Sequence, residues 1–152
     1  MKVFEAIKQK LDAAGIAYHV EHHEPTRTSE DAARIRGVAL HSGAKAIVVT
    51  GEKTHTYTLF VMPADLRLDS KKVRALLGES VSFAQDVEAV TGCVPGSVPP
   101  FGSIIGLKTY VDQRLADNLE INFNAGSLTD SIRMRYDEYL RIEQPSVMDI
   151  VK

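Results

Sequence analysis

The spacing of apolar residues along the chain predicts an N-terminal helix followed by a strand. Val3, Ile7 and Leu11 recur every four residues, which places them on one face of a helix that can end at Gly15. Apolar and polar side chains then alternate over residues 16–21, as in a strand with one buried face.

A second helix is predicted to begin at Ser29 and to end near Gly37. The hydroxyl of Thr28 or Ser29 can cap its free N–H groups. Glu30 and Asp31 follow at the positive end of the helix dipole, where acidic side chains are favourable.

The central part of the chain predicts a β-hairpin and a third helix. Two runs rich in apolar and β-branched residues, 44–50 and 57–62, flank a polar loop of about five residues. Asp69 or Ser70 can cap the helix that follows over residues 71–77.

The second half of the chain predicts more strands than helices. A short strand over 81–84 and one or two helical turns over 85–91 precede a glycine- and proline-rich loop over 92–102. The remaining elements are strands over 104–111, 120–124 and 131–135, and a helix or a further strand over 136–142. The chain shows no internal repeat, so we expect one α/β domain over residues 1–152.

Composition places the chain among soluble globular proteins and limits its partners. Hydrophobic residues make up 44% of the 152 residues, enough apolar material for one core. The 18 basic and 20 acidic residues give a formal net charge of −2, which argues against a broad nucleic-acid-binding surface. The longest apolar run, 59–64, is too short to span a membrane, and the single cysteine allows no internal disulfide. We expect a cytoplasmic protein that binds neither membranes nor DNA.

The loop over residues 92–102 is the first candidate for chemistry. Pro95, Pro99 and Pro100 fix its backbone, while Gly96 allows main-chain atoms to approach a ligand closely. Such a loop can point its remaining N–H groups into a pocket that binds an oxyanion or a phosphate. The same composition also suits a tight connection between two strands.

Basic residues provide two further candidates. Lys45, at the start of an apolar strand, could reach a phosphate or a sugar hydroxyl, although a solvent-facing lysine at a strand edge is more common. Lys71 and Lys72 lie in the first turn of a helix and oppose its dipole. They indicate either a phosphate partner or a solvated face paired with Asp65 or Asp69.

Histidine and cysteine provide weaker candidates. On a strand, His19 and His23 share one face and His22 lies on the other, and no acidic or cysteine partner has metal-site spacing. We therefore expect no metal. The chain has no Walker loop and no dinucleotide-binding fingerprint either, so we expect no cofactor. Cys93 has no nearby histidine in sequence to form a thiolate, so we interpret it as a small packed thiol.

Five motifs, in their order and spacing, resemble one known family. They are TSEDAA (28–33), GAK (43–45), FVMPADLRLDSKK (60–72), GSVPPFG (96–102) and FNAG (123–126). On these residues the chain resembles the YbaK/prolyl-tRNA-synthetase-associated domain family, the free-standing trans-editing deacylases, over about residues 15–143. The resemblance implies an α/β domain whose mixed sheet, strongly curved or barrel-like, is surrounded by helices. It also implies an enzyme that hydrolyses the ester linking a wrong amino acid to tRNA.

The resemblance further implies which residues form the site. The family's lysine, which holds the terminal adenosine in relatives, corresponds to Lys45, and its glycine–proline loop, which contacts the aminoacyl group, begins at Gly96. The implied catalytic residues are Lys45, Gly96, Ser97, Pro100 and Gly102. Substrate contacts are expected from Thr28, Ser29, Phe101, Asn124, Ala125 and Gly126, and tRNA contacts from Lys71, Lys72, Arg74 and Lys108.

The substrate and partners follow from the same resemblance. An aminoacyl ester is already activated, so its hydrolysis depends on positioning and on main-chain N–H groups that stabilise an oxyanion. A small amino acid (Ser or Thr, Ala or Cys) is expected, and Ser97, Asn124 or Thr129 could bond the hydroxyl of serine or threonine. The expected partners are mischarged tRNA, in particular tRNA(Pro), and prolyl-tRNA synthetase. The alternatives are a non-catalytic module that binds a tRNA end or a nucleotide, and a domain that docks on a synthetase.

Overall fold

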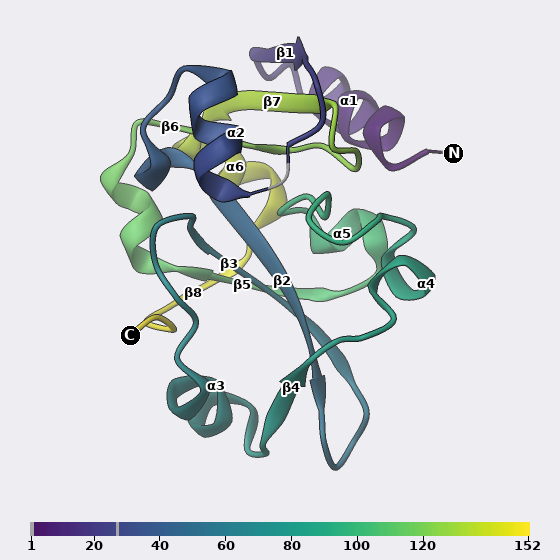
Figure 1. The fold of residues 1–152 in the computed structure, drawn as a ribbon, viewed down its shortest axis with the longest axis vertical. Helices are drawn as coiled ribbons and strands as arrows, with labels where there is room; N and C mark the ends of the chain where they lie inside the picture. Colours follow the sequence, from purple (N-terminus) through teal and green to yellow (C-terminus); the bar gives the residue numbers. More distant parts are fainter. Residues whose placement is uncertain (1, 27) are drawn as a thin grey trace.

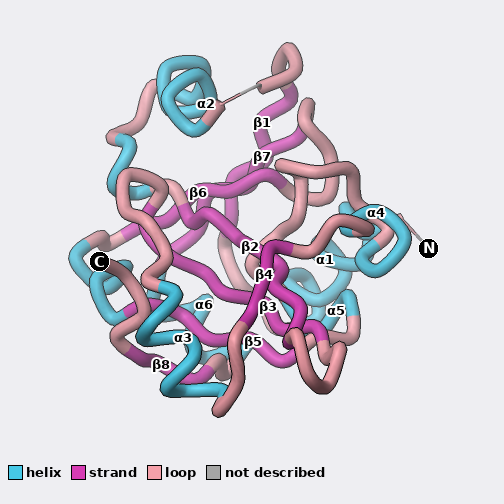
Figure 2. The backbone as a smooth tube through the Cα atoms, turned by 60° about the horizontal axis from the view of Figure 1, so that its bottom comes forward, coloured by secondary structure: helices cyan, strands magenta, loops and turns pink. Residues whose placement is uncertain are grey.

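The computed structural model describes residues 2–26 and 28–152, and its strands form two sheets with helices around them (Figures 1 and 2). The smaller sheet is antiparallel and has the order β1 (Tyr18–His22), β7 (Asp130–Arg135), β6 (Glu120–Asn124). The larger sheet has the order β4 (Val81–Phe83), β2 (Ala44–Gly51), β3 (Tyr57–Pro63), β5 (Lys108–Asp112), β8 (Ser146–Met148). Its β2–β3 and β2–β4 pairs are antiparallel, whereas β3–β5 and β5–β8 are parallel. The expected mixed α/β architecture is therefore confirmed.

The strands do not close into a barrel, one of the two forms that the resemblance implied. β4 and β8 remain the edges of the larger sheet, and β1 and β6 the edges of the smaller one. The two sheets meet at an isolated bridge between Gly43 and Asn122, next to the start of β2.

Local sequence signals account for most of the helices. These are α1 (Val3–Ala13), α2 (Ser29–Arg36), α3 (Ser70–Leu77), α4 (Val87–Thr91), α5 (Gly102–Ile105) and α6 (Tyr136–Glu143), with 3-10 turns η1 (Leu40–Ser42) and η2 (Gln113–Asp117). Thr28 caps α2 by accepting a hydrogen bond from the Asp31 N–H at 3.0 Å, and Gly37 ends that helix with a φ of 68°. None of the helices among the described residues is long and apolar enough to cross a membrane.

Two hydrophobic clusters pack on the two faces of the larger sheet. Val48 belongs to the cluster that contains α1, the smaller sheet and Phe101, whereas Val49 belongs to the cluster that contains Val73 of α3. Alternate residues of β2 therefore serve different cores, as expected for a strand covered on both faces.

Candidate functional site

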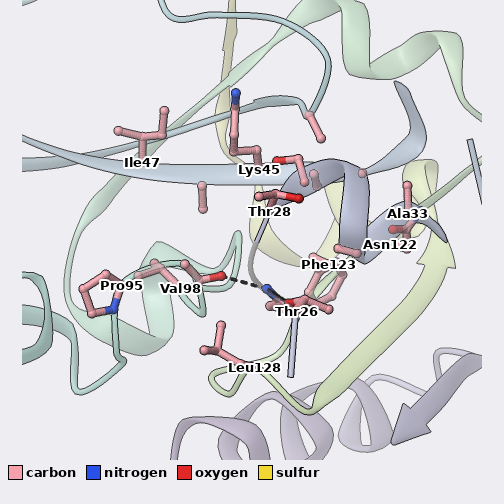
Figure 3. A pocket seen from close by; sticks show the side chains of 18 of the residues that line it. Thr26, Thr28, Ala33, Lys45, Ile47, Pro95, Val98, Asn122, Phe123 and Leu128 are labelled. Atoms are coloured by element: carbon pink, nitrogen blue, oxygen red, sulfur yellow. Dashed lines mark hydrogen bonds between the residues drawn. The ribbon is translucent and has the colours of Figure 1, made fainter. Parts of the chain in front are cut away.

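A cavity of about 650 Å³ lies between α2, the first half of β2, β6 and the loop after α4 (Figure 3). It is located where β2 has no neighbouring strand on the side away from β3. β4 pairs with β2 only over residues 49–51, and β2 residues 44–48 line the cavity. The open stretch of β2 thus gives a ligand access to both faces of the strand.

The loop after α4 contributes Gly96 and Val98 to the cavity wall. Its prolines carry no N–H group, and the Ser97 N–H donates to the Val94 carbonyl at 3.0 Å. Neither the Gly96 nor the Val98 N–H donates to an acceptor within residues 2–26 and 28–152. These two main-chain donors are therefore available to a ligand.

Asn124 joins this loop to the rest of the site. Its Nδ2 donates to the Gly96 carbonyl at 2.7 Å and, over a longer distance of 3.4 Å, to Thr26 Oγ1. Its Oδ1 accepts a hydrogen bond from Arg36 Nη2. The Asn124 amide is thus oriented by Arg36 and in turn holds Gly96 against β6.

Arg36, in the last turn of α2, also lines the cavity. Its Nε donates to Ser131 Oγ and its Nη1 to Asn122 Oδ1, both at 2.8 Å. All three of its hydrogen-bond partners are neutral, and burial lowers the pKa of Arg36 to about 10, so the side chain stays charged at neutral pH. No pattern in the sequence marks Arg36 as part of a site, because an arginine in a helix's last turn is ordinary.

Lys45 lines the same cavity, but its ammonium points away from the loop. Nζ donates to the Leu66 carbonyl at 2.8 Å, and Figure 3 shows Lys45 on one side of β2 with Pro95 and Val98 on the other. Burial, and secondarily the charge of Arg67, lower the pKa of Lys45. The ammonium and the loop therefore share one cavity across β2 rather than facing each other directly.

The remaining residues implied by the resemblance fall into two groups. Thr28, Ser29 and Asn124 line the cavity. The others do not: they are Ser97, Pro100, Phe101, Gly102, Ala125 and Gly126. Most of them are buried, and the Pro100 carbonyl accepts a hydrogen bond from Tyr139 Oη at 2.7 Å.

The basic residues expected to bind tRNA lie outside the cavity. Lys71, Lys72 and Arg74 are on α3, and Lys108 begins β5. Lys72 Nζ is already bonded to Asp149 Oδ1 at 2.9 Å and to the Val151 carbonyl at 2.7 Å. Lys71 and Arg74 are exposed and make no side-chain hydrogen bond or ion pair to a described residue.

Two of the three candidate histidines have structural partners, and the cysteine is buried. His22 Nδ1 pairs with Asp130 at 2.8 Å, and His23 Nε2 pairs with Ser131 Oγ at 2.6 Å. Among the described residues, no three or more His, Cys, Asp or Glu side chains are grouped to hold a metal ion. Cys93 is buried, which raises the pKa of its thiol and keeps it protonated.

Comparison with known proteins identifies the family. Residues 23–142 match the model of the aminoacyl-tRNA editing domain. The chain belongs to this family. The resemblance found from the five motifs is thereby confirmed.

Relatives of this editing domain cover nearly its whole length. It is 35% identical over 145 residues to the multifunctional Ser/Thr-tRNA deacylase ProXp-y of Escherichia coli K12. The alignment covers 91% of this chain and 87% of the relative. The solved structure of a proposed trans-editing enzyme for prolyl-tRNA synthetase superposes with a TM-score of 0.86 at 27% identity, over 100% of this chain and 98% of the other. A hypothetical protein with a TM-score of 0.87 and 23% identity, over 96% and 99% of the two chains, shares the fold.

Proposed function

We propose that this editing domain is a deacylase that hydrolyses the ester between a wrong amino acid and the 3′ end of tRNA, acting in trans. Family membership and the similarity to ProXp-y support the proposal. The observation that carries it is that Gly96 and Val98, whose N–H groups have no acceptor among the described residues, line a cavity sized for a nucleoside with a small aminoacyl group.

The reaction needs little besides these groups. Water attacks the ester carbonyl carbon, and the carbonyl oxygen becomes an oxyanion that the Gly96 and Val98 N–H groups stabilise. The bond from this carbon to the ribose oxygen then breaks, and the proton lost by the water is transferred to that oxygen. The products are the free amino acid and tRNA with an intact 3′ hydroxyl. The neighbouring ribose hydroxyl can orient the attacking water.

Lys45 has a separate role in this proposal. Its ammonium can exchange the Leu66 carbonyl for an oxygen of the terminal ribose or phosphate, a charge-assisted hydrogen bond. Lys45 then fixes the nucleotide on one side of β2 while the ester reaches the loop on the other side.

The cavity wall favours serine or threonine as the amino acid removed. Asn124 and Thr26 provide polar atoms in the cavity, beside the apolar side chains of Val98 and Phe123. A serine or threonine hydroxyl can bond to the first pair, and a threonine methyl group can pack on the second pair. Ser97 is fully buried and does not line the cavity, so it is not the hydroxyl's partner.

We further propose tRNA(Pro) as the tRNA substrate and prolyl-tRNA synthetase as the enzyme whose errors are corrected. A panel of Ser-, Thr-, Ala-, Cys- and Pro-tRNA(Pro) tests this directly, with released amino acid as the readout. We expect Ser- and Thr-tRNA(Pro) to be hydrolysed fastest and Pro-tRNA(Pro) to be spared. Lys45→Ala should lower kcat/KM roughly 10–100-fold, the effect of losing one charge-assisted hydrogen bond, without loss of the folded state. Saturable tRNA binding with no released amino acid would contradict the proposal and indicate a binding module.

A further inference from the structure

Phe83, the last residue of β4, lines the cavity and is also exposed to solvent. Its side chain lines the cavity, yet the residue is 59% exposed, whereas Phe60, Phe101 and Phe123 are fully or almost fully buried. The core therefore does not use this ring. A flat aromatic face at the rim of a cavity is a ready surface for stacking.

The strand register places Phe83 on the same side of β2 as Lys45. Phe83 pairs with Val49, and side chains of directly paired residues lie on the same face of a sheet. Lys45, Ile47 and Val49 share that face because strand side chains alternate. Figure 3 shows Lys45 and Ile47 together on one side of β2, opposite Val98. The cavity therefore has two parts, one on each face of β2.

The side of β2 that carries Phe83 also carries positive charge. Arg67 lies close enough to Lys45 to lower its pKa. It is exposed and makes no side-chain hydrogen bond or ion pair to a described residue. Asp65 and Glu30 also act on Lys45, so the charge is local and partly balanced. Phe83 pairs with Val49, four residues along β2 from Lys45, so a nucleotide whose base stacks on the ring can extend its phosphate along the strand towards the Lys45 ammonium.

We propose that Phe83 stacks on the terminal adenine of the tRNA while the aminoacyl ester crosses the open stretch of β2 to reach Gly96 and Val98. This inference rests on the proposed function and assigns one side of the site to the base. The small side chains of Ala44 and Ala46, which line the cavity, leave space at the crossing point. The base and the amino acid then occupy opposite faces of one strand.

Steady-state deacylation with Ser-tRNA tests the role of Phe83. Phe83→Ala should raise KM about tenfold or more, the effect of losing one base–aromatic stack, with kcat changed less than about twofold. Phe83→Trp, which keeps an aromatic face, should keep KM within about threefold of the wild type. Leu119→Ala is the matched control, because Leu119 is 70% exposed and does not line the cavity. An unchanged KM for Phe83→Ala, or an equal rise for Leu119→Ala, would overturn the proposal.

A binding experiment separates this inference from the proposed function. A CCA-ended RNA minihelix with 2-aminopurine in place of the terminal adenine reports stacking by loss of fluorescence, without any hydrolysis. We expect the wild type and Phe83→Trp to quench the probe and Phe83→Ala to lose the quenching. Equal quenching by wild type and Phe83→Ala, or none by the wild type, contradicts the stacking. If the quenching depends on Phe83 but the protein releases no amino acid, the deacylase proposal is wrong and the stacking proposal stands.

Discussion

Arg36 contacts side chains on two neighbouring strands, β6 and β7, and through Asn124 it fixes the position of Gly96. The guanidinium geometry suits this task, because its donors lie in one plane at fixed angles. Arg36 is therefore a positioning residue for the loop that carries the two available N–H groups.

Replacing Arg36 should disturb both stability and catalysis. In the Arg36→Met variant, the side chains of Asn122, Asn124 and Ser131 each lose a hydrogen-bond donor. We therefore expect the free energy of unfolding to fall by about 1–3 kcal/mol. The loop also loses its tether, so kcat should fall at least about tenfold while KM changes less. Urea denaturation and single-turnover kinetics measure the two effects.

Arg34→Met is the matched control for this prediction. Arg34 lies on the same helix, is largely exposed and pairs with Asp31 at the surface, where an ion pair contributes little stability. Equal stability and equal kcat in the two variants would show that Arg36 does not position the loop.

At the residue scale, the resemblance could locate Lys45, Gly96 and Asn124 in the chain but not how they are held. The partners of Asn124 come from α2 and the loop, and no local pattern links these segments. Arg36 and Phe83 carry no local signal either, because an arginine near a helix end and a phenylalanine in a strand are ordinary. Their roles depend on tertiary contacts that exist only in the folded chain.

At the element scale, the strand predicted over residues 104–111 is partly wrong. Ser103, Ile104 and Ile105 belong to the short helix α5, and only β5 (Lys108–Asp112) is a strand. The carboxylate of Glu143 accepts hydrogen bonds from the Ser103 N–H at 3.0 Å and from Ser103 Oγ at 2.6 Å. This cap comes from forty residues further along the chain, so the local sequence could not reveal it. The N-terminal caps of α2 and α3 and the glycine that ends α2, in contrast, are local and were predicted correctly.

Gly102 has a packing role at the start of α5. A Cβ atom there would lie 2.0 Å from Thr109 Oγ1 and 2.2 Å from the Leu107 carbonyl oxygen, so the helix and β5 could not stay in contact. We expect Gly102→Ala to lower the free energy of unfolding by about 1–3 kcal/mol, as overpacked sites do. Thermal or urea denaturation measures this.

Gly51→Ala provides the comparison for Gly102. The atoms nearest to a Cβ at Gly51 belong to the Glu79 carboxylate, which can move aside if it gives up its hydrogen bonds from Lys53 N–H, Thr54 N–H and Thr54 Oγ1. Because these bonds are exposed and water can replace them, Gly51→Ala should cost less than Gly102→Ala, where the Cβ would meet backbone. Equal losses for the two variants would argue against close packing of α5 on β5.

His41 links three elements by two carboxylate contacts. Its Nδ1 pairs with Asp65, after β3, at 2.8 Å, and its Nε2 pairs with Asp117, in η2, at 3.0 Å. The hydrogen bonds to Asp65 and then Asp117 raise the pKa of His41. Protonation is therefore favoured in the folded state. The resulting stabilisation is present below the unfolded pKa of about 6.5 and is lost as the pH rises through the higher folded value.

This linkage predicts a pH-dependent difference between wild type and His41→Gln. The wild type should be more stable than the variant at pH 6, and the difference should shrink at a pH above the folded pKa of His41. Urea denaturation at a series of pH values measures it. His19→Gln is the control, because His19 is exposed and has no hydrogen bond to a described residue. A pH-independent difference for His41→Gln would contradict the assigned ion pairs.

At the scale of the whole molecule, a net charge of −2 limits how tRNA can be bound. Because α3 contacts β4, which carries Phe83, we propose that the acceptor stem leaves the cavity at Phe83 and passes the exposed Lys71 and Arg74 of α3. Each phosphate contact should contribute about −0.7 to −0.9 to the slope of log binding constant against log salt. With so few cations available, we expect a total slope no steeper than about −3.

Substitutions on α3 test this route for the tRNA. Lys71→Gln and Arg74→Gln should each reduce the salt slope by about 0.7–0.9, measured from tRNA dissociation constants at several KCl concentrations. Lys72→Gln should change the slope less, because the Lys72 ammonium is already bonded to Asp149 and the Val151 carbonyl. Equal effects of all three substitutions, or none, would place the tRNA elsewhere on the protein.

β4 pairs with only part of β2, and this partial pairing affects both the stability of the protein and the access of substrate to the cavity. β4 ends at Phe83, and the chain turns away towards α4 after one further hydrogen bond, from the Ala84 N–H to the Val48 carbonyl. Continued pairing would add ladder bonds along Ala46 and Ala44, but it would seal the only stretch of β2 among the described residues that lines the cavity. Mutations that lengthen β4 should therefore make the protein more stable but exclude the substrate from the cavity.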